Sequence, residues 1–283
     1  MIAQISVIVC TRNSQRTLTD CLGSIKNQTI PVELVVVDNG STDQSASIAA
    51  RFAKKVINWG PERSAQRNRG VADAVGQYVL IIDSDMRLSP TVCQECVEIL
   101  ASQTEIRALV IPEASVGQGF WAQCKALERS FYVGVPWMEA ARCFRKADFI
   151  SVGGYDENNT GTEDFDLPQR LESQYGARCI SRTVSPIDHD EGVISIFGSA
   201  KKKFYYAQRL SVYAAQKSNQ QKFRLQSSPL RRYRLFFSEP TRLLRSPLIG
   251  LGMLTLKTTE MLAAAAGTLF PKVGFNMRDS IYK

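Results

Sequence analysis

Three short apolar runs rich in β-branched residues are the feature that most limits what this chain can fold into. They cover residues 4–10, 32–37 and 77–82, and segments with a helical spacing of apolar residues follow the first two. Continuous apolar runs of this kind suit strands that are buried on both faces of a parallel sheet. Strands alternating with helices predict an α/β fold, in which ligands bind at the carboxyl ends of the strands.

Polar residues follow each of the three runs. They are Cys10–Asn13 after the first run, Asp38–Asp43 after the second and Asp83–Asp85 after the third. Side chains at positions i and i+2 of a strand share a face, and two carboxylates held close repel each other unless a cation lies between them. Oxygen ligands favour Mg²⁺ or Mn²⁺. Asp83 and Asp85 therefore form either a metal site or a simple Asp-Ser-Asp turn, which these residues also suit.

Six blocks of the sequence together resemble the successive motifs of family 2 glycosyltransferases with the GT-A fold. The blocks are Ser6–Asn13, Val35–Asp43, Arg67–Gly70, Leu80–Asp85, Gly153–Glu157 and Thr162–Leu167. The resemblance covers about residues 4–190, and the order of the blocks is far more specific than any one of them. It implies a mostly parallel, Rossmann-like sheet flanked by helices. It also implies inverting transfer of a sugar, expected to be a hexose, from a nucleotide-diphosphate donor to an acceptor hydroxyl in bacterial envelope polysaccharide or glycolipid assembly.

The resemblance implies a donor site residue by residue. Thr11 and Asp38 would contact the nucleoside, and Arg67 would lie near the base or the diphosphate. The full set expected to bind the donor is Thr11, Arg12, Asp38, Arg67, Asp83 and Ser84. Asn39 departs from the family pattern, in which many members carry a second Asp at this position. An amide still donates or accepts a hydrogen bond, so the departure bears on the choice of nucleoside.

A divalent metal is the cofactor that the resemblance implies. Asp83 and Asp85 would hold Mn²⁺ or Mg²⁺ against the donor diphosphate, because a fixed cation offsets the charge that develops on the leaving group. His189 is the only histidine, and we expect it in an acidic loop after a strand over residues 180–184. It is either a solvated residue or a further ligand to the metal or the diphosphate, since neutral imidazole binds Mn²⁺ well.

Asp164 is the expected general base, because inversion needs one base on the face opposite the leaving group. The segment Thr162–Asp164 is equally a capping box that opens a helix over about residues 165–175. Asp166 lies nearer the interior of that helix. The residues expected on the acceptor side are Gly153, Gly154 and Glu163, with the two glycines letting the backbone approach the acceptor closely.

Charge divides the chain into a body and a C-terminal appendage. The chain carries 35 Lys and Arg against 27 Asp and Glu, a net charge of +8. Residues 197–245 hold twelve of the bases and one acid, so the rest of the chain is slightly acidic. We expect a catalytic domain over residues 1–192, with a nucleotide-sugar half at about 1–112 and an acceptor half at about 113–192. A helical, basic and apolar region is expected over 193–283.

The basic segment favours a membrane surface over nucleic acid. No recognised nucleic-acid module accompanies it, whereas Lys and Arg suit anionic head groups and Tyr and Phe suit the boundary below them. Residues 246–270 are mostly apolar, but the run before Lys257 is shorter than the ~20 residues that span a bilayer. Lys257 and Glu260 can pair on one helix face. We expect residues 197–270 to contact a membrane through an interfacial or re-entrant segment; a soluble helix covering the catalytic domain or a homodimer partner stays open.

Cysteine usage and the N-terminus bear on location and function class. Seven scattered Cys indicate free thiols in a reducing compartment, and the first run lacks the basic region of a signal peptide. We expect a cytoplasmic protein, peripheral on the membrane, with a lipid-linked or polysaccharide acceptor.

Two other function classes are open to a chain of this kind. A nucleotidyltransferase would need a phosphate-cradling Gly-rich loop, which Thr11–Asn13 is not. A non-catalytic nucleotide-sugar or lipid-binding protein would not need the three acids Asp83, Asp85 and Asp164.

Overall fold

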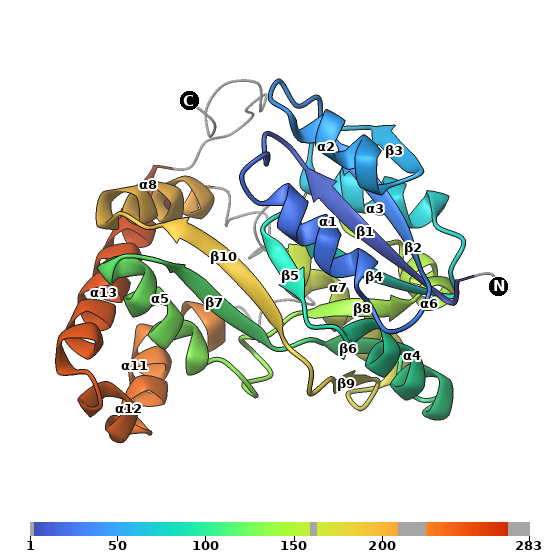
Figure 1. Cartoon of the computed structure of the whole chain (residues 1–283). Helices are drawn as coiled ribbons and strands as arrows, with labels where there is room; N and C mark the ends of the chain where they lie inside the picture. The colour runs from blue at the N-terminus through green and yellow to red at the C-terminus, as the bar shows by residue number, and fades with distance from the viewer. Residues whose placement is uncertain (1–2, 159–162, 209–224, 271–283) are drawn as a thin grey trace.

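A seven-stranded sheet forms the centre of the computed structural model, which describes residues 3–158, 163–208 and 225–270 (Figure 1). Its strand order is β3-β2-β1-β4-β8-β6-β9. The strands are β1 Ile5–Thr11, β2 Val32–Asp38, β3 Lys55–Asn58, β4 Tyr78–Asp83, β6 Ala108–Val110, β8 Ala141–Arg145 and β9 Ile180–Arg182. The first four strands are parallel, and β8 runs antiparallel to both of its neighbours. The chain order reverses between β1 and β4, where α/β sheets bind ligands.

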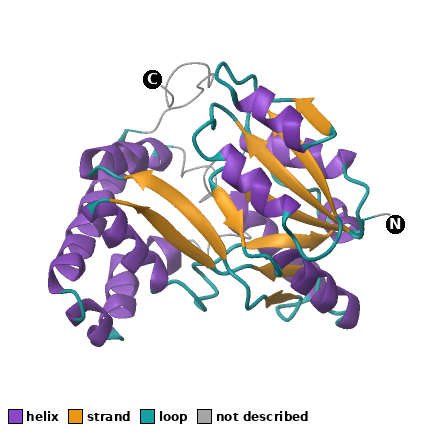
Figure 2. Cartoon of the chain, in the orientation of Figure 1, coloured by secondary structure: helices purple, strands orange, loops and turns teal. Residues whose placement is uncertain are grey.

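Helices pack on both faces of this sheet (Figure 2). One face packs against α1 Leu18–Lys26, α2 Ser45–Phe52 and α4 Val92–Ser102, and the other against α3 Arg63–Asp73, α6 Lys146–Ser151 and α7 Glu163–Tyr175. Alternate side chains of β1 enter the two cores: Val7 and Val9 belong to one apolar cluster, Ile8 and Cys10 to the other. The expected α/β sheet is therefore confirmed, because its strands are buried on both faces.

The helices follow from the apolar spacing of the sequence. The buried residues of α1 are Leu18, Cys21, Leu22 and Ile25, which recur at intervals of three and four. In α2 the buried positions include Ile48 and Ala49. All seven cysteines are buried and free, as the sequence predicts.

A smaller sheet of three strands lies beside the large one. It consists of β5 Met86–Leu88, β10 Ile187–Val193 and β7 Glu113–Gln118, in the order β5-β10-β7. His189 lies within β10, paired with Met86 on one side and Ser115 on the other. The expectation of a loop at His189 is wrong. Backbone pairing on both sides holds this polar segment in a strand that has no apolar alternation to reveal it.

Among the described residues, α5 and the helices that follow β10 gather at the far end of the small sheet, on the left in Figure 1. They are α5 Phe120–Ser130, α8 Ile196–Ala207, α11 Pro229–Phe237, α12 Pro240–Leu244 and α13 Pro247–Leu269. A third apolar cluster joins Cys124 and Phe131 to Phe236 and Met253, so helices from both sides of residue 192 share one core. The expected boundary at residue 192 therefore divides the sequence by composition, but the apolar core at this end of the molecule contains residues from both sides of it. Part of the basic segment, residues 209–224, lies outside the described residues.

Candidate active site

The residues predicted to bind the nucleoside lie at the carboxyl edge of the large sheet. Thr11 and Asp38 end β1 and β2 and are partners in the strand register, and Asp83 ends the adjacent β4. Asp38 is buried and accepts hydrogen bonds from the backbone N and the Oγ of Ser41, at 2.9 and 2.5 Å. The buried hydroxyl of Thr11 has no hydrogen-bond partner within the described part of the chain. These positions agree with a donor site at the sheet edge, and the roles of the residues stay predictions.

Arg67 is the centre of the site. Its side chain is 0% exposed and donates to Asp83 Oδ1 at 2.9 Å and to Asp164 Oδ1 at 2.6 Å. A third carboxylate, that of Glu163, lies 3.5 Å away, and the guanidinium carbon lies 5.1 Å from the centroid of the Tyr155 ring. One buried side chain of α3 therefore connects the end of β4 with the start of α7.

This arrangement keeps the central groups charged. Burial alone would raise the pKa of Asp83, but Arg67, Arg142 and Arg63 outweigh it and hold that pKa well below its usual range. Burial alone would lower the pKa of Arg67, and the facing Asp164 and Asp83 raise it well above its ordinary value instead. Asp83 is therefore ionised at neutral pH, the state that a cation ligand needs.

The second acid of the Asp-Ser-Asp motif faces the only histidine. Asp85 Oδ2 lies 3.4 Å from His189 Nε2, and His189 Nδ1 lies 3.4 Å from Glu113 Oε2. Burial alone would lower the pKa of His189, but its contacts with Asp85 and Glu113 raise that pKa to about 10. Arg142 Nε lies 2.5 Å from Glu113 Oε1, and an Arg142 guanidinium nitrogen lies 3.8 Å from Asp83 Oδ2.

Metal-ligating side chains are present but do not form a closed cage. Asp85 Oδ1 is buried and has no hydrogen-bond partner among the described residues. Within residues 3–158, 163–208 and 225–270, no three His, Cys, Asp or Glu side chains are grouped so as to hold a metal ion by themselves. The oxygen atoms of Asp83 and Asp85 and the imidazole of His189 are nevertheless donor types that suit Mn²⁺ or Mg²⁺.

The remaining predicted residues lie around this centre. Ser84 Oγ donates to Ser14 Oγ at 2.8 Å, and Arg12 is partly exposed. Glu163 is 1% exposed, and its carboxylate pairs with Arg63 at 3.1 Å and with Arg67 at 3.5 Å. Its contact with an acceptor stays a prediction. The expected cap residue Thr162 lies outside the described residues.

Gly153 and Gly154 form a turn for which glycine is required. Their φ angles are +86° and +65°, values that other residues rarely adopt. A Cβ atom on Gly154 would also lie 2.7 Å from Asn68 Oδ1. The turn fixes the backbone that leads into Tyr155, and its predicted role at the acceptor stays a prediction.

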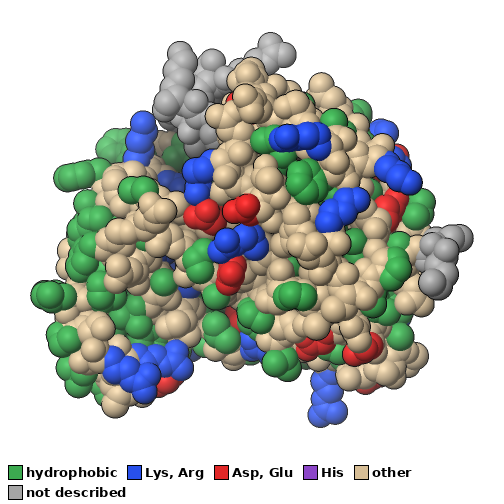
Figure 3. Space-filling model, viewed as in Figure 1, with side chains coloured by type: hydrophobic (Ala, Val, Ile, Leu, Met, Phe, Trp, Pro, Cys, Tyr) green, Lys and Arg blue, Asp and Glu red, His purple; other side chains and the backbone are tan. Residues whose placement is uncertain are grey.

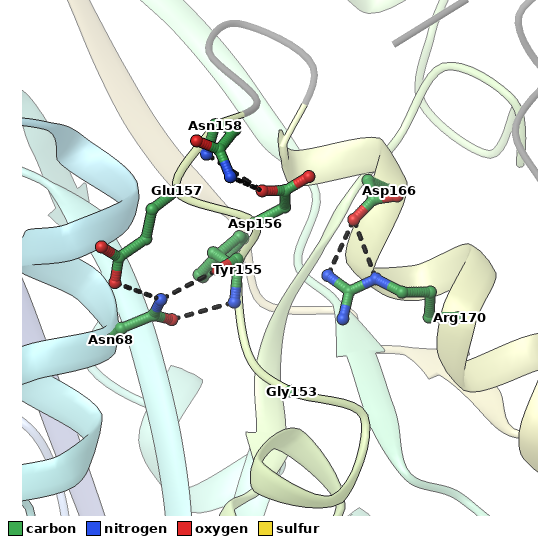
Figure 4. Close-up of a pocket in the computed structure, with 8 residues that line it drawn as sticks. All are labelled: Asn68, Gly153, Tyr155, Asp156, Glu157, Asn158, Asp166 and Arg170. Carbon is green, nitrogen blue, oxygen red and sulfur yellow. Dashed lines mark hydrogen bonds and ion pairs between the residues drawn. The ribbon is translucent and has the colours of Figure 1, made fainter. Parts of the chain in front are cut away.

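A polar pocket of about 640 Å³ lies between α3 and α7 (Figure 4). Its lining residues are Asn68, Gly153, Tyr155, Asp156, Glu157, Asn158, Asp166 and Arg170. Figure 4 shows Asn68 reaching from α3 to the backbone of Tyr155, where it makes two hydrogen bonds of 2.9 Å. Asp166 faces Arg170 in the same view, at 2.7 Å, and its side chain is 3% exposed. This places Asp166 in a structural ion pair, as its position nearer the helix interior suggests.

Sequence reasoning missed three charged residues of the site: Arg63, Glu113 and Arg142. Arg63 lies four residues before Arg67 on α3, and that spacing puts both on one helix face. Arg142 lies in a strand whose other residues are apolar over Ala141–Phe144, and it is only 8% exposed. A lone charge inside an apolar strand is a usable signal, because buried charges are paired or functional. Glu113 carries no such local signal.

Part of the chain is similar to a known protein family and to individual proteins of bacteria. The family described as "Glycosyl transferase family 2" matches residues 6–153. The putative glycosyltransferase EpsH of Bacillus subtilis (strain 168) is 32% identical over 109 residues, which are 36% of this chain and 32% of EpsH. The poly(ribitol-phosphate) beta-N-acetylglucosaminyltransferase TarS of Staphylococcus aureus (strain Mu50) is 37% identical over 92 residues, 28% of this chain and 16% of TarS. The chain thus matches a third or less of the length of these relatives.

Two solved structures share the fold over nearly the whole chain. The mannosyltransferase PcManGT from Pyrobaculum calidifontis, in complex with GDP-Man and Mn²⁺, has a TM-score of 0.61 at 18% identity. The match covers 94% of this chain and 87% of PcManGT. Residues 1–349 of S. aureus TarS give a TM-score of 0.52 at 17% identity, covering 94% and 90% of the two chains. At these identities the likeness concerns the fold alone.

Proposed function

The chain belongs to glycosyl transferase family 2, and on this premise we propose that it transfers a sugar, with inversion, from a nucleotide-diphosphate donor to an acceptor hydroxyl. The observation that carries the proposal is the contact of one buried guanidinium, that of Arg67, with both Asp83 and Asp164. Inverting transfer needs positive charge at the leaving diphosphate and a base at the incoming hydroxyl. Asp83 would hold a cation that supplies positive charge at the diphosphate, and Asp164 would act as the base at the incoming hydroxyl.

A divalent cation fits the donor side of the proposed site. The unpartnered Oδ1 of Asp85 is an oxygen ligand without another use among the described residues. We propose that Asp83, Asp85 and, once a cation has displaced its proton, His189 hold Mn²⁺ or Mg²⁺ together with oxygens of the donor diphosphate, because these side chains alone form no closed cage among the described residues. When bound there, the cation would offset the charge on the departing nucleoside diphosphate. The fold relative PcManGT, which is described with Mn²⁺, supports this choice.

Asp164 is the proposed base because its carboxylate is accessible. Its side chain is 27% exposed, whereas that of Asp166 is 3% exposed and paired with Arg170. The acceptor oxygen attacks the anomeric carbon from the face opposite the phosphate, the bond to the leaving phosphate oxygen breaks, and Asp164 takes the hydroxyl proton. Arg67 holds one oxygen of Asp164 and so fixes the direction of the carboxylate.

The acceptor is proposed to be a lipid-linked or polysaccharide hydroxyl that enters beside Gly153, Gly154 and Glu163. Two relatives name a polymer or a lipid: TarS names poly(ribitol-phosphate), and the cholesterol galactosyltransferase of Borreliella burgdorferi, 34% identical over 100 residues, names cholesterol. We also propose a peripheral location on the cytoplasmic face of a membrane, held through residues 197–270.

The test measures nucleoside diphosphate released from UDP-, GDP- and TDP-sugars in the presence of Mn²⁺. We expect Asp83→Ala and Asp164→Asn each to lower the release by about a hundredfold or more, because each removes a group that acts in the transition state. Asp73→Asn is the matched control, since this carboxylate belongs to a surface ion pair with Arg69 on the same helix as Arg67. Release that survives both active-site substitutions would contradict the mechanism.

A further inference from the structure

The last described helix, α13, turns its charged residues inward and most of its leucines outward. Lys257 and Glu260 are each 3% exposed. The exposed leucines of the helix are Leu248 at 76%, Leu251 at 65%, Leu262 at 67% and Leu269 at 76%. A helix on the surface of a water-soluble protein usually presents the opposite arrangement. The outer face of α13 is therefore suited to an apolar partner.

The inward face of α13 is fixed to the body of the protein. Lys257 Nζ lies 2.6 Å from Glu128 Oε1 and 2.9 Å from Glu260 Oε2, and Lys125 Nζ lies 3.1 Å from Glu260 Oε1. Gly252 is in close contact with α5, where an added Cβ would meet the Phe120 ring at 2.5 Å. By length and composition α13 could cross a membrane. Doing so would carry Lys257 and Glu260 away from their partners into hydrocarbon, which is costly.

The exposed leucines of α13 form one stripe in which the polar groups are satisfied. Leu248, Leu251, Leu262 and Leu269 lie on one side of the helix over about 32 Å of its length, and Leu244 at the end of α12 is exposed as well. Two threonines, Thr255 and Thr258, interrupt the leucines. Their hydroxyls donate to the backbone carbonyls of Leu251 and Leu254, at 2.9 and 2.7 Å. The stripe can therefore enter an apolar medium without leaving these hydroxyls unpaired.

Cationic side chains flank this leucine stripe. Arg231, Arg234 and Arg245 are exposed, whereas Arg232 and Arg242 point inward to Tyr132 Oη and to the carbonyl of Ser130. Figure 3 shows hydrophobic side chains along the edge where α13 lies in Figure 1, with Lys and Arg gathered below them over α11 and α12. The described acids after residue 193 are Glu260, which is buried, and Glu239, which pairs with Arg242. The flank is thus suited to anionic groups.

We propose that α13, together with α11 and α12, is the face by which the protein lies on a bilayer that contains anionic lipid. The helix axis lies parallel to the membrane, the leucine stripe enters the boundary between head groups and acyl chains, and the flanking arginines meet lipid phosphates. The inference rests on the membrane association proposed above and not on sugar transfer. A second copy of the chain is the alternative occupant of this face, and the oligomeric state tests it.

The same group of helices adjoins the active site. Arg129 of α5 lies 3.8 Å from Glu191 of β10, the strand that also holds His189. α5 in turn packs along α13. The face proposed for the membrane therefore belongs to the same helical group that contacts the strand of the site histidine.

Vesicle binding of the full chain tests the inference. We expect sedimentation with phosphatidylcholine vesicles containing phosphatidylglycerol, and weaker binding to phosphatidylcholine alone or at high salt. Leu251→Ser/Leu262→Ser should lower the partition coefficient by about tenfold or more, because apolar area sets much of interfacial affinity. The control is Val75→Ser/Val184→Ser, which changes two apolar residues outside the stripe that are at least as exposed as Leu251. Arg231→Gln/Arg234→Gln should weaken binding to the anionic vesicles only.

Two further measurements separate the alternatives. Light scattering after size exclusion reports the oligomeric state: a dimer that the leucine variant dissociates, with vesicle binding unchanged, would overturn the inference in favour of a second copy. Equal vesicle binding by the leucine variant and its control would overturn it as well. Donor turnover without vesicles should be the same in both variants. Vesicle binding by a protein that turns over no donor would count against the proposed function and still support the inference.

Discussion

Among single residues, Arg67 has the strongest effect on the site because it is the buried partner of two acids. Arg67→Met would remove the guanidinium that contacts both Asp83 and Asp164, leaving Arg142, 3.8 Å from Asp83 Oδ2, as a more distant cation. We expect the free energy of unfolding to fall by about 3 kcal/mol. This is the lower end for a buried pair, since the two carboxylates are 19% and 27% exposed. Urea unfolding followed by circular dichroism measures the loss.

The control for this substitution is Arg69→Met, two residues along the same helix. Arg69 is 42% exposed and pairs with Asp73 on the surface, so its removal should cost less than about 1 kcal/mol. Equal losses for the two variants would show that Arg67 stabilises the protein no more than a surface ion pair does.

Glu113 is predicted to set the orientation of His189 at the proposed metal site. Its carboxylate lies on the Nδ1 side of the ring, which leaves Nε2 directed at Asp85. Outer partners of this kind typically change metal affinity by about 10- to 100-fold when removed. We therefore expect Glu113→Gln to weaken Mn²⁺ binding about tenfold, measured as free Mn²⁺ by electron paramagnetic resonance with UDP present.

Asp188→Asn is the matched control for Glu113, because Asp188 lies in the same small sheet and pairs with Arg87 at the surface. Its Mn²⁺ affinity should stay within about twofold of the wild type, a change well below the range for outer-shell partners. Unchanged Mn²⁺ binding in Glu113→Gln would show that the ring does not depend on this carboxylate.

The residues of the site differ in how far the sequence reveals them. Asp83, Asp85 and Asp164 lie in motifs that can be recognised locally. Glu113 carries no local signal, and the lone charge of Arg142 in an apolar strand does not reveal its partner, because the two residues meet His189 and Asp83 only through the pairing of β7 with β10 and of β4 with β8. Such contacts depend on strand order, which no local pattern of residues specifies.

Among the elements, the spacing of apolar residues predicted the helices that bury one side and the strands that are buried on both faces. β1, β2 and β4 agree with the expected runs to within a residue or so, and α1 buries the spaced residues that predicted it. β10 could not be predicted, because its polar residues Asp188–Glu191 have no buried face to alternate against. Its conformation comes from hydrogen bonds to β5 and β7, which are distant in sequence.

Four charged residues lie where α13 packs on α5: Glu128, Lys257 and Glu260, which are buried, and Lys125, which is 12% exposed. Lys257→Met would leave Glu128 and Glu260 with Lys125 as their close partner, and we expect a loss of about 3 kcal/mol in the free energy of unfolding. Lys257→Met/Glu260→Met keeps the Lys125–Glu128 pair at 2.9 Å, so the double variant should regain most of that loss. Urea unfolding of the two variants and the wild type measures the coupling.

Lys202→Met is the control for α13, since Lys202 is an exposed base on the neighbouring α8. It should change the free energy of unfolding by about 0.5 kcal/mol or less. A double variant less stable than the single one would contradict the expected compensation. It would mean that Glu260 stabilises the helix by contacts other than its pair with Lys257.

For the whole molecule, the sequence predicted the separation of charge but not how the C-terminal helices pack. The expected pair of Lys257 and Glu260 is confirmed at 2.9 Å. Its inward direction was not predictable, because the partners Lys125 and Glu128 come from a helix in the expected acceptor half. The appendage and the catalytic body are therefore distinct in composition and joined in their core.

Removing the C-terminal helices tests how independent the expected domains are. A chain ending at residue 192 would expose Cys124, Phe131 and Tyr132, which are 0%, 3% and 6% exposed in the full chain. It would also leave Lys125 and Glu128 without their partners on α13. We expect such a chain to bind the dye ANS, to associate in size exclusion and to unfold at a lower temperature than the full chain, because newly exposed apolar patches promote association.

A chain ending at residue 270 is the control, since it keeps every helix of the third apolar cluster. If the chain ending at 192 melted at the temperature of that control and bound no dye, residues 1–192 would be an independent folding unit, and the shared core would contribute little to stability.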